Sequence, residues 1–294
     1  MVTLAVGLAG AGRRGTGVHA PAIAACSGIR LAAVWGRTPA LVRNLAERYD
    51  VPGFTRYVDF LAQCDAVTFA VPPVVQADLA ESAAQARKPM LLERPLAGDL
   101  AGAERVTDAV ISAKVVSQLA LTWRYSVAVR EFVEVVAPRA WPQGGSGRVI
   151  SGVLAHPDRS SPWQIERGVL MAHGPDLVDL LDAVLGRVLG VRAHGDPGGW
   201  VGLMLEHEGG HFSEVSLYAS VEGQADRAEA EVVGPGGTAD VDCTTAVGPD
   251  TFETMYDEFA VAVEAGNEPD LDVRRGLHLQ QILDNAETDL YRGM

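Results

Sequence analysis

A glycine-rich turn near the start of the chain constrains the fold more than any other feature. Residues 3–9 are a short apolar run rich in Leu, Val and Ala, as expected of a strand buried on both faces of a parallel sheet. Gly10-Ala11-Gly12-Arg13-Arg14-Gly15 follows directly, and a helix is predicted after it. In such a unit the first glycine makes the tight turn, the second lets backbone approach a pyrophosphate, and the third lets helix pack closely on strand. An ordinary glycine turn is the alternative, but the flanking strand and helix favour dinucleotide binding at the helix N-terminus.

Strands and helices alternate over the first part of the chain. Apolar runs indicate strands at residues 31–35, 66–71, 89–92 and 115–119. Helices are predicted between them, ending near Tyr49 and covering residues 73–87 and 100–112, and Thr38-Pro39 supplies an N-cap and a first helical proline. This alternation predicts an α/β fold with a doubly wound parallel sheet, a Rossmann domain, over residues 1–121.

The pattern changes near Thr122. One helix (residues 127–136) precedes a stretch rich in Pro and Gly (residues 138–147), and alternating apolar and polar residues then predict a series of strands. The strands are expected at residues 149–155, 189–193, 201–206, 213–220 and 228–233, with helices at residues 170–185, 251–265 and 274–291. Residues 122–294 are therefore predicted to form a second domain of the α+β type.

The composition excludes several classes of protein. The chain has 294 residues, 48% of them hydrophobic, which is enough for two packed cores. Its formal net charge of -14 repels phosphates and anionic lipid, so neither nucleic acid nor a membrane is an expected partner. The apolar runs end well before the roughly 20 residues of a membrane span, and the first residues lack a basic signal segment, so a cytoplasmic protein is expected. Cys26, Cys64 and Cys243 form no Cys-x-x-Cys pair, which argues against disulfides and a thiolate metal site.

The end of the second predicted strand indicates which dinucleotide binds. An NAD site usually has an Asp or Glu there, about 20 residues after the glycines, to hold the ribose hydroxyls. Here the sequence reads Trp35-Gly36-Arg37-Thr38, and no carboxylate occurs between Leu31 and Asn44. Arg37 can pair with a 2′-phosphate and stack on adenine, and Thr38 can donate a hydrogen bond. We expect NADP(H) as the preferred cofactor, and NAD(H) as the alternative if Arg37 is only a solvated loop charge.

Further motifs resemble one family of oxidoreductases. Glu93-Arg94-Pro95, after the predicted strand at residues 89–92, is similar to the Glu-Lys-Pro signature of the Gfo/Idh/MocA family, the group of glucose-fructose oxidoreductase and inositol dehydrogenases. The other segments that resemble this family are His19-Ala20-Pro21-Ala22, Val71-Pro72-Pro73, Trp123-Arg124-Tyr125, Tyr256-Asp257-Glu258-Phe259 and Gly276-Leu277. The resemblance covers nearly the whole chain. It implies an open, mainly antiparallel sheet in the second domain and an active site in the cleft beneath the nicotinamide.

The glycine turn, the end of the second predicted strand and the resemblance together indicate which residues contact the cofactor and the substrate. The residues expected at the cofactor are Gly10, Gly12, Arg13, Arg14, Gly15, Arg37, Thr38, Val71, Pro72, Pro73, Gln76, Glu93 and Arg94. Those expected at the substrate are Trp123, Arg124, His156 and Trp163, although Gln164 replaces the Arg that follows this Trp in the family. The Arg94-Pro95 bond is expected to be cis, because X-Pro bonds have only a small trans preference and a turn here must aim Arg94 into the cleft.

The sequence departs from the family where the chemistry is expected. Arg94 replaces the family's Lys, and it can stabilise an oxyanion but stays protonated, so it does not exchange the proton. The segment Ala172-His173-Gly174-Pro175-Asp176 resembles the family's Asp-x-Gly-x-His helix start, with Ala172 in place of the Asp and Asp176 in place of the catalytic His. His173 and Asp176 are three residues apart and can share a helical face as a relocated acid/base pair, unless His173 only caps or packs. The expected proton donor is Asp176, His173 or Tyr125.

His207-Glu208-Gly209-Gly210-His211 matches the His-Glu-x-x-His zinc pattern letter for letter. Zinc binding requires a helix, because only that geometry brings histidines four apart onto one face. Two consecutive glycines disfavour a helix interior, and the flanking segments alternate like paired strands. We therefore predict a hairpin here and no metal site.

Taken with the resemblance, these features predict an NADP-dependent or NAD-dependent oxidoreductase. The expected reaction transfers a hydride between the nicotinamide and a carbonyl, hydroxyl or imine carbon of a small polar metabolite, either a sugar or a secondary-metabolite intermediate. The alternatives are a dinucleotide-binding regulatory protein, or a non-redox protein of the same fold with a degenerate active site. Because an open sheet leaves one face uncovered, we also expect a homodimer or homotetramer that buries the outer face of the second domain's sheet.

Overall fold

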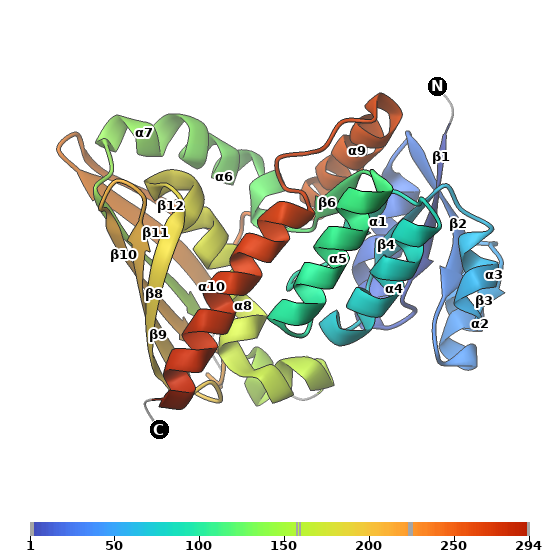
Figure 1. Cartoon of the computed structure of the whole chain (residues 1–294), viewed down its shortest axis with the longest axis horizontal. Helices are drawn as coiled ribbons and strands as arrows, with labels where there is room; N and C mark the ends of the chain where they lie inside the picture. Colours follow the sequence, from blue (N-terminus) through green and yellow to red (C-terminus); the bar gives the residue numbers. More distant parts are fainter. Residues whose placement is uncertain (1–2, 157, 159, 223–225, 293–294) are drawn as a thin grey trace. The chain divides into compact units, whose positions relative to one another are not determined.

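The computed structural model describes residues 3–156, 158, 160–222 and 226–292 (Figure 1). It divides into two compact units, one made of Met1–Ala120 and Pro249–His278, the other of Leu121–Gly248 and Leu279–Met294. The first unit thus takes in residues 249–278, which the division at residue 121 assigned to the second domain. Helix α10 (Val273–Arg292) contributes residues to both units. Among the described residues, no helix is both long and apolar enough to cross a membrane.

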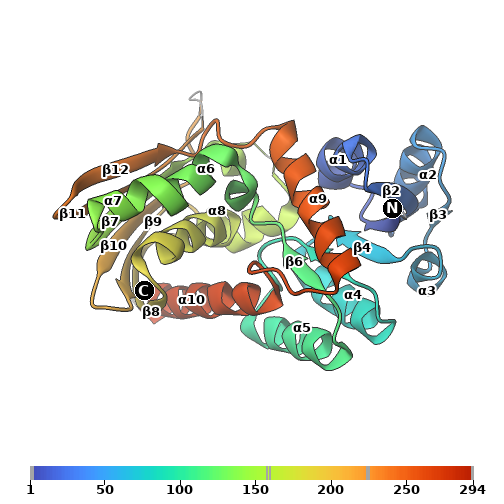
Figure 2. The same ribbon diagram turned by 90° about the horizontal axis from the view of Figure 1, so that it is seen from above.

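The first unit is built around a parallel sheet. Its strands, in sheet order, are β3 (Gly53–Phe54), β2 (Ile29–Trp35), β1 (Leu4–Ala9), β4 (Ala66–Phe69), β5 (Met90–Leu92) and β6 (Ser117–Leu119). Its helices are α1 (Ala20–Ala25), α2 (Pro39–Arg48), α3 (Tyr57–Leu61), α4 (Pro73–Gln85), α5 (Leu100–Ala113) and α9 (Pro249–Ala265). Helices α4 and α5 cover one face of the sheet, and α1 and α9 the other (Figure 2). Because both faces are covered, β4 and β5 are buried along their whole length. The strand order confirms the predicted Rossmann fold.

The second unit contains a mixed sheet. Its strands, in sheet order, are β12 (Gly237–Asp242), β11 (Arg227–Gly234), β7 (Gly144–Ile150), β10 (Phe212–Tyr218), β9 (Trp200–His207) and β8 (Val188–Gly195). The pair β7 and β10 is parallel, and the other pairs are antiparallel. Helix α8 (Pro162–Leu185) packs on β7, β9 and β10, and α7 (Ala137–Ala140) packs on β11 and β12. Residues along β9 and β10 alternate between buried and exposed, because helices cover one face and the other is open. The predicted open, mainly antiparallel sheet is confirmed.

Some segments differ from the sequence prediction. The strand expected at residues 149–155 is β7, which starts at Gly144 inside the stretch predicted to be a connection. A Cβ at Gly145 would lie 2.8 Å from the carbonyl oxygen of Glu231, so this glycine allows two strands to approach rather than making a turn. Helix α8 starts eight residues before the expected position and is kinked at Gly168, whose φ is 70°. The strands β3 and β12 and the helix α3 are missing from the prediction, because β3 and α3 are very short and β12 is rich in Gly and Asp, which are rare in strands.

Candidate functional site

The glycine turn lies at the carboxyl end of β1. Gly10 has a φ of 136°, and a Cβ there would lie 2.3 Å from the carbonyl oxygen of Ala70. A Cβ at Gly15 would lie 1.9 Å from the carbonyl oxygen of Gly10. The fold itself therefore requires these two glycines. A Cβ at Gly12, in contrast, has no atom of the described chain within 4 Å.

The open surroundings of Gly12 fit a bound pyrophosphate. In a dinucleotide site the second glycine lets phosphate approach the backbone, and a side chain there would fill that space. The exposed Arg13 and Arg14 follow it and lead into the helical segment that contains η1 (Gly15–His19) and α1. Amide groups at the start of a helix are unpaired and favour anions. The turn can therefore hold the diphosphate of NAD or NADP.

The end of β2 lies beside this turn. The amide of Gly10 donates to the carbonyl oxygen of Trp35 at 2.8 Å, and a Cβ at Gly36 would lie 3.5 Å from the Cβ of Ala11. Arg37 and Thr38 come next and are both exposed. Their position is the one at which a Rossmann domain contacts the adenosine ribose.

Gln76 holds the chain that leaves β5. Its side-chain amide donates to the carbonyl oxygens of Glu93 at 2.7 Å and Leu96 at 2.9 Å, and its Oε1 accepts from the amide of Glu93 at 2.9 Å. The Arg94-Pro95 bond is cis, which confirms the prediction, and Arg94 is half-buried. Gln76 is itself fully buried on α4, and Val71 and Pro72, which precede that helix, are half-buried. Since β1, β4 and β5 are neighbours in a parallel sheet, the predicted cofactor residues at their carboxyl ends share one edge of the sheet.

The Glu93 carboxylate joins the glycine turn to this edge. Its Oε1 accepts hydrogen bonds from Nε of Arg14 and, at 2.8 Å, from Nε2 of His19. The other ring nitrogen of His19 contacts the hydroxyl of Tyr256 on α9 at 2.7 Å, and that hydroxyl lies 3.0 Å from Oγ1 of Thr68 on β4. The sequence motifs included His19 and Tyr256 but gave neither a role, and Thr68 was not singled out.

Charges and burial act in opposite directions on this cluster. Burial opposes ionisation of Glu93, but the Arg14 guanidinium and the hydrogen bond from His19 outweigh it and hold the pKa of Glu93 well below its ordinary value. Burial also lowers the pKa of His19, and the nearby Glu93 carboxylate offsets only part of that effect. At neutral pH the cluster therefore contains an ionised Glu93, a cationic Arg14 and an uncharged His19.

In the second unit, His173 and Asp176 lie on α8. Asp176 is 5% exposed, and His173 is half-buried. The carboxylate of Asp176 is near the buried thiol of Cys243, whose pKa is raised to about 12 by burial, with further contributions from Asp176 and Asp242. This thiol stays protonated at neutral pH, so it adds no charge beside Asp176.

The residues after Thr122 have packing partners within the second unit. The Nη1 of Arg124 donates a hydrogen bond to the carboxylate of Asp179 on α8 at 3.1 Å. Asp179 is only 1% exposed. Tyr125 is 2% exposed, and the guanidinium of Arg130 lies 5.6 Å from its ring centroid. These contacts give Arg124 and Tyr125 structural roles, and their assignments to substrate and proton transfer stay predictions. Trp123 is half-buried.

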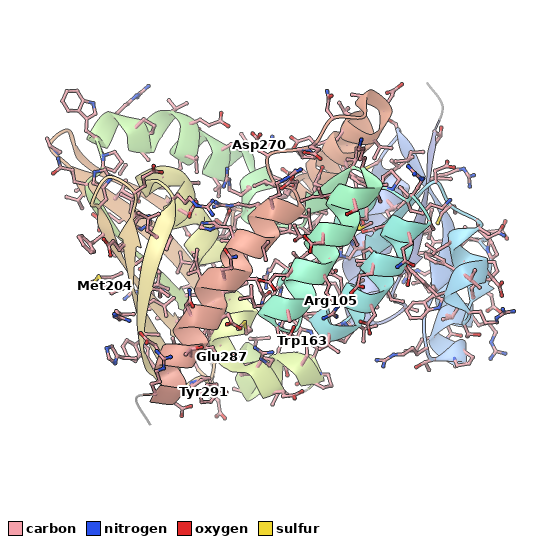
Figure 3. All side chains as sticks on the ribbon, in the orientation of Figure 1. Arg105, Trp163, Met204, Asp270, Glu287 and Tyr291 are labelled. Atoms are coloured by element: carbon pink, nitrogen blue, oxygen red, sulfur yellow. The ribbon has the colours of Figure 1, made fainter. Side chains whose placement is uncertain are left out.

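The start of α8 explains the departure at Gln164. The Oε1 of Gln164 accepts hydrogen bonds from the backbone amide and the hydroxyl of Ser161, at 2.9 and 2.8 Å. Ser161 and Gln164 thus form a capping box at the first turn of the helix. Trp163, labelled in Figure 3, is half-buried beside it, as is His156 in the preceding segment. A Gln at this position stabilises the helix start, which an Arg would not do in the same way.

The His-Glu-x-x-His segment is a hairpin turn between β9 and β10, as predicted. Gly209 and Gly210 have φ values of 85° and 80°, which a helix does not allow. The ring nitrogens of His207 contact the carbonyl oxygen of Gly186 and the hydroxyl of Ser213, both at 2.7 Å. Both ring nitrogens of His207 are thus used in hydrogen bonds that hold the hairpin in place.

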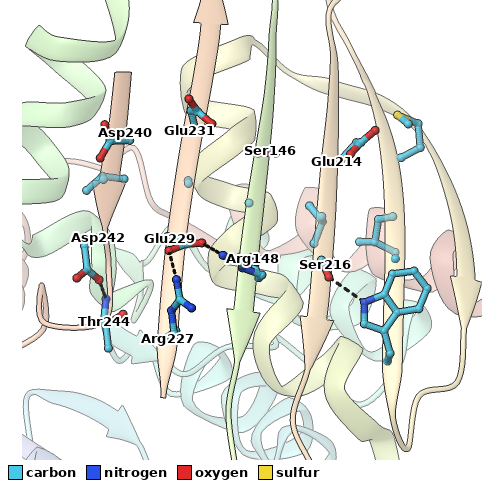
Figure 4. Close-up of a pocket in the computed structure, with 18 of the residues that line it drawn as sticks. Ser146, Arg148, Glu214, Ser216, Arg227, Glu229, Glu231, Asp240, Asp242 and Thr244 are labelled. Atoms are coloured by element: carbon cyan, nitrogen blue, oxygen red, sulfur yellow. Dashed lines mark hydrogen bonds and ion pairs between the residues drawn. The ribbon is translucent and has the colours of Figure 1, made fainter. Parts of the chain in front are cut away.

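A hollow of about 1010 Å³ lies on the open face of the second unit's sheet. Small residues of the central strands, among them Ser146, Ser216 and Gly202, line it, and Ser146 and Ser216 are labelled in Figure 4. Charged side chains such as Arg148 and Glu231 stand around it, and the indole of Trp200 donates to Ser216 Oγ at 2.8 Å. None of the predicted cofactor, substrate or catalytic residues lines this hollow.

Sequence comparison supports the dinucleotide assignment. Residues 4–121 match the model of an oxidoreductase family with an NAD-binding Rossmann fold, the Gfo/Idh/MocA family. No curated protein matches the chain. The matched residues contain the glycine turn and the Glu93-Arg94-Pro95 segment.

Solved structures extend the fold likeness to the whole chain. The WlbA dehydrogenase from Bordetella pertussis, in complex with NADH and UDP-GlcNAcA, has a TM-score of 0.89 and 20% identity over 100% of this chain and 98% of its own. The scyllo-inositol dehydrogenase from Lactobacillus casei has a TM-score of 0.85 and 16% identity over 99% and 97%. A protein from Desulfitobacterium hafniense, proposed to be an NADPH-dependent oxidoreductase, has a TM-score of 0.87 and 18% identity over 100% and 97%.

Proposed function

We propose that this chain, whose N-terminal domain belongs to the Gfo/Idh/MocA oxidoreductase family, transfers a hydride between NADP(H) and a carbonyl, hydroxyl or imine carbon of a small polar metabolite. The observation that carries the proposal is the open space at Gly12, beside glycines that the fold itself requires. A Cβ at Gly12 has no described atom within 4 Å, so packing of the fold does not require a glycine there, and Gly12 stands at the position where a pyrophosphate approaches the backbone in a dinucleotide site. The nicotinamide supplies the hydride chemistry when the cofactor is bound.

The preference for NADP(H) rests on Arg37 and Thr38. Both are exposed directly after β2, where they can contact a 2′-phosphate, and no carboxylate stands nearby in sequence to bind free ribose hydroxyls. The similar solved structures do not decide this point, since one contains NADH and another is proposed to use NADPH. NAD(H) is the alternative cofactor.

In this proposal the protein's own residues position the reactants and move the proton. Arg94 orients the substrate oxygen and stabilises negative charge on it, because a guanidinium keeps its charge and offers several donors. The proton donor is Asp176, His173 or Tyr125, since Arg94 does not exchange a proton at neutral pH. A carboxyl group must be protonated to donate a proton, and burial favours the protonated form. The low exposure of Asp176 is therefore compatible with this role.

The experiment that tests the proposal follows the absorbance of NADPH with the purified protein across a panel of ketones, ketosugars and imines. Steady oxidation that requires both protein and substrate is expected, and Arg94→Met should lose most of the turnover. The rival proposal is a dinucleotide-binding protein without redox turnover, and the replacements at Arg94 and Asp176 favour it. NADPH binding without oxidation of any substrate in the panel would support that rival.

Assembly and location belong to the same proposal. The open face of the second unit's sheet, with its hollow, is the surface proposed to pair with a second copy of the chain in a homodimer or homotetramer. A cytoplasmic location is consistent with Cys26, Cys64 and Cys243, which are all buried and form no disulfide.

A further inference from the structure

Four side chains from separate parts of the first unit form one continuous line of hydrogen bonds, which we call the Glu93 network. It runs from Thr68 Oγ1 to the Tyr256 hydroxyl (3.0 Å), to His19 Nδ1 (2.7 Å), and from His19 Nε2 to Glu93 Oε1 (2.8 Å). Thr68, Tyr256 and His19 are each 0% exposed. Three buried polar groups of this kind are costly to leave unpaired, so the line of contacts is a built feature rather than a chance contact.

The direction of each hydrogen bond follows from Glu93. An ionised carboxylate only accepts, so Nε2 of His19 carries the proton and donates. In an uncharged ring, Nδ1 is then an acceptor, and the Tyr256 hydroxyl donates to it. The Tyr256 oxygen in turn accepts from the hydroxyl of Thr68. The Glu93 carboxylate thus fixes the tautomer of the His19 ring, and the Tyr256 hydroxyl helps to hold the orientation of that ring.

The protonation states of His19 and Tyr256 agree with these hydrogen-bond directions. Burial lowers the pKa of His19, which keeps the ring uncharged although the Glu93 carboxylate partly opposes that effect. The titratable and charged groups that face His19 are Glu93, Arg14 and Tyr256. Burial raises the pKa of Tyr256 far above its ordinary value, so its hydroxyl stays a donor.

The network does not deliver protons to a substrate. Its far end is Thr68, which is buried in the middle of the sheet on β4 and has no titratable side chain. A proton that left His19 could not be replaced from solvent along this line. The remaining role is mechanical, because the network holds the carboxylate that pairs with Arg14.

We propose that Tyr256 and His19 are positioning residues for the dinucleotide, which act through Glu93 on Arg14 in the glycine turn. Arg14 lies between Gly12 and Gly15, so the ion pair with Glu93 fixes the segment whose amide groups face the phosphate. Affinity for the cofactor then depends on a hydroxyl group supplied by α9, far along the chain from the turn. The inference rests on the proposed function.

The test is a double-mutant cycle on the dissociation constant of NADPH, measured by fluorescence titration. Tyr256→Phe should weaken binding about tenfold, a factor that corresponds to about 1.4 kcal/mol. In an Arg14→Met background the same change should weaken binding less than about twofold, because Arg14 is the residue through which the network acts. Tyr57→Phe is the matched control, since its hydroxyl also donates to a carbonyl oxygen in the same unit, that of Leu79 at 3.1 Å, but lies outside the network. Wild-type affinity in Tyr256→Phe, equal losses in both backgrounds, or the same loss in Tyr57→Phe would overturn the proposal.

A second measurement uses the unmodified protein and does not depend on the folding of a variant. Nitrogen-detected correlation spectra of the His19 ring, assigned by their absence in His19→Gln, should show the uncharged Nε2-H tautomer and should shift when NADPH is added. A ring protonated on Nδ1, or signals that do not respond to NADPH under saturating conditions, contradicts the inference. Failure of the unmodified protein to bind any dinucleotide contradicts the proposed function instead, while the tautomer still tests the network.

Discussion

The substitution Gly12→Ala distinguishes a glycine that the fold requires from one that a bound ligand requires, because it should change the affinity for NADPH and not the stability of the protein. No described atom lies within 4 Å of a Cβ at Gly12, and the same holds at Gly17, five residues further along the same segment. Neither glycine has a positive φ, so alanine fits the backbone at both positions. The pair therefore makes a matched comparison in which only Gly12 is expected to face the pyrophosphate.

The expected magnitudes follow from these surroundings. Replacing Gly by Ala where the backbone is compatible stabilises a protein by about 0.4 to 1 kcal/mol, so neither variant should lower the melting temperature. At Gly12 the added methyl group would occupy space that the phosphate needs, and overpacking of this kind costs about 1 to 3 kcal/mol. That cost corresponds to roughly 5-fold to 150-fold weaker binding of NADPH. At Gly17 no change in affinity is expected.

The assay is a fluorescence titration of each variant with NADPH, together with thermal unfolding by circular dichroism. The reasoning is refuted if Gly12→Ala binds NADPH as tightly as the unmodified protein, or if Gly17→Ala loses affinity to the same degree. A Gly12→Ala variant that unfolds at a much lower temperature would also refute it, because the structure gives the methyl group nothing to clash with.

Four other predictions follow from the site and the sheets. Arg37→Asp should weaken NADPH binding by roughly tenfold to a hundredfold, from loss of charged hydrogen bonds, and equal affinities of the unmodified protein for NADPH and NADH would contradict this. If Asp176 is the proton donor, Asp176→Asn should lower turnover by about 10² to 10⁴ with NADPH binding retained and His173→Ala should be mild, whereas the reverse pattern assigns the role to His173. The melting temperature should fall as the pH drops below 6.5, because the pKa of His19 is lower in the folded protein than its ordinary value of 6.5. Below that pH the unfolded chain binds the proton more readily than the folded protein, which favours unfolding. A melting temperature that stays constant between pH 7 and 5 would contradict this prediction. Light scattering should show an oligomer at micromolar concentration that Ser146→Arg on the open sheet face dissociates, and a monomeric unmodified protein would exclude that interface.

Much of the first unit could be predicted because its sequence marks the elements directly. Strands such as β1 and β4 are mainly apolar runs that end shortly before a Gly or a Pro, and the glycine turn indicates the edge of the sheet at which a ligand is expected. The packing of residues 249–278 on this unit could not be predicted in the same way. An amphipathic helix shows which of its faces is buried, but not which surface covers it. The contact between Tyr256 and His19 joins residues 237 positions apart, and no local pattern records it.

The site residues show the same limit. The cis bond at Arg94-Pro95 is expected from the turn that must aim Arg94 into the cleft, and the exposed Arg37 follows from local sequence. The partner of Arg124 does not, since its pairing with Asp179 depends on how α8 packs in the second unit. Gln164 looked like a lost cation in the motif, whereas its hydrogen bonds to Ser161 form a helix cap that depends on where α8 starts. The sequence motifs indicate which side chains belong to the candidate site, but tertiary packing decides which group each side chain contacts.

The central claim is that the glycine turn of this chain binds a nicotinamide dinucleotide. The most direct measurement is calorimetric titration of the purified, unmodified protein with NADPH and, separately, with NADH. We predict saturable binding of one dinucleotide per chain, with the tighter affinity for NADPH. The absence of saturable binding for both dinucleotides would contradict the claim.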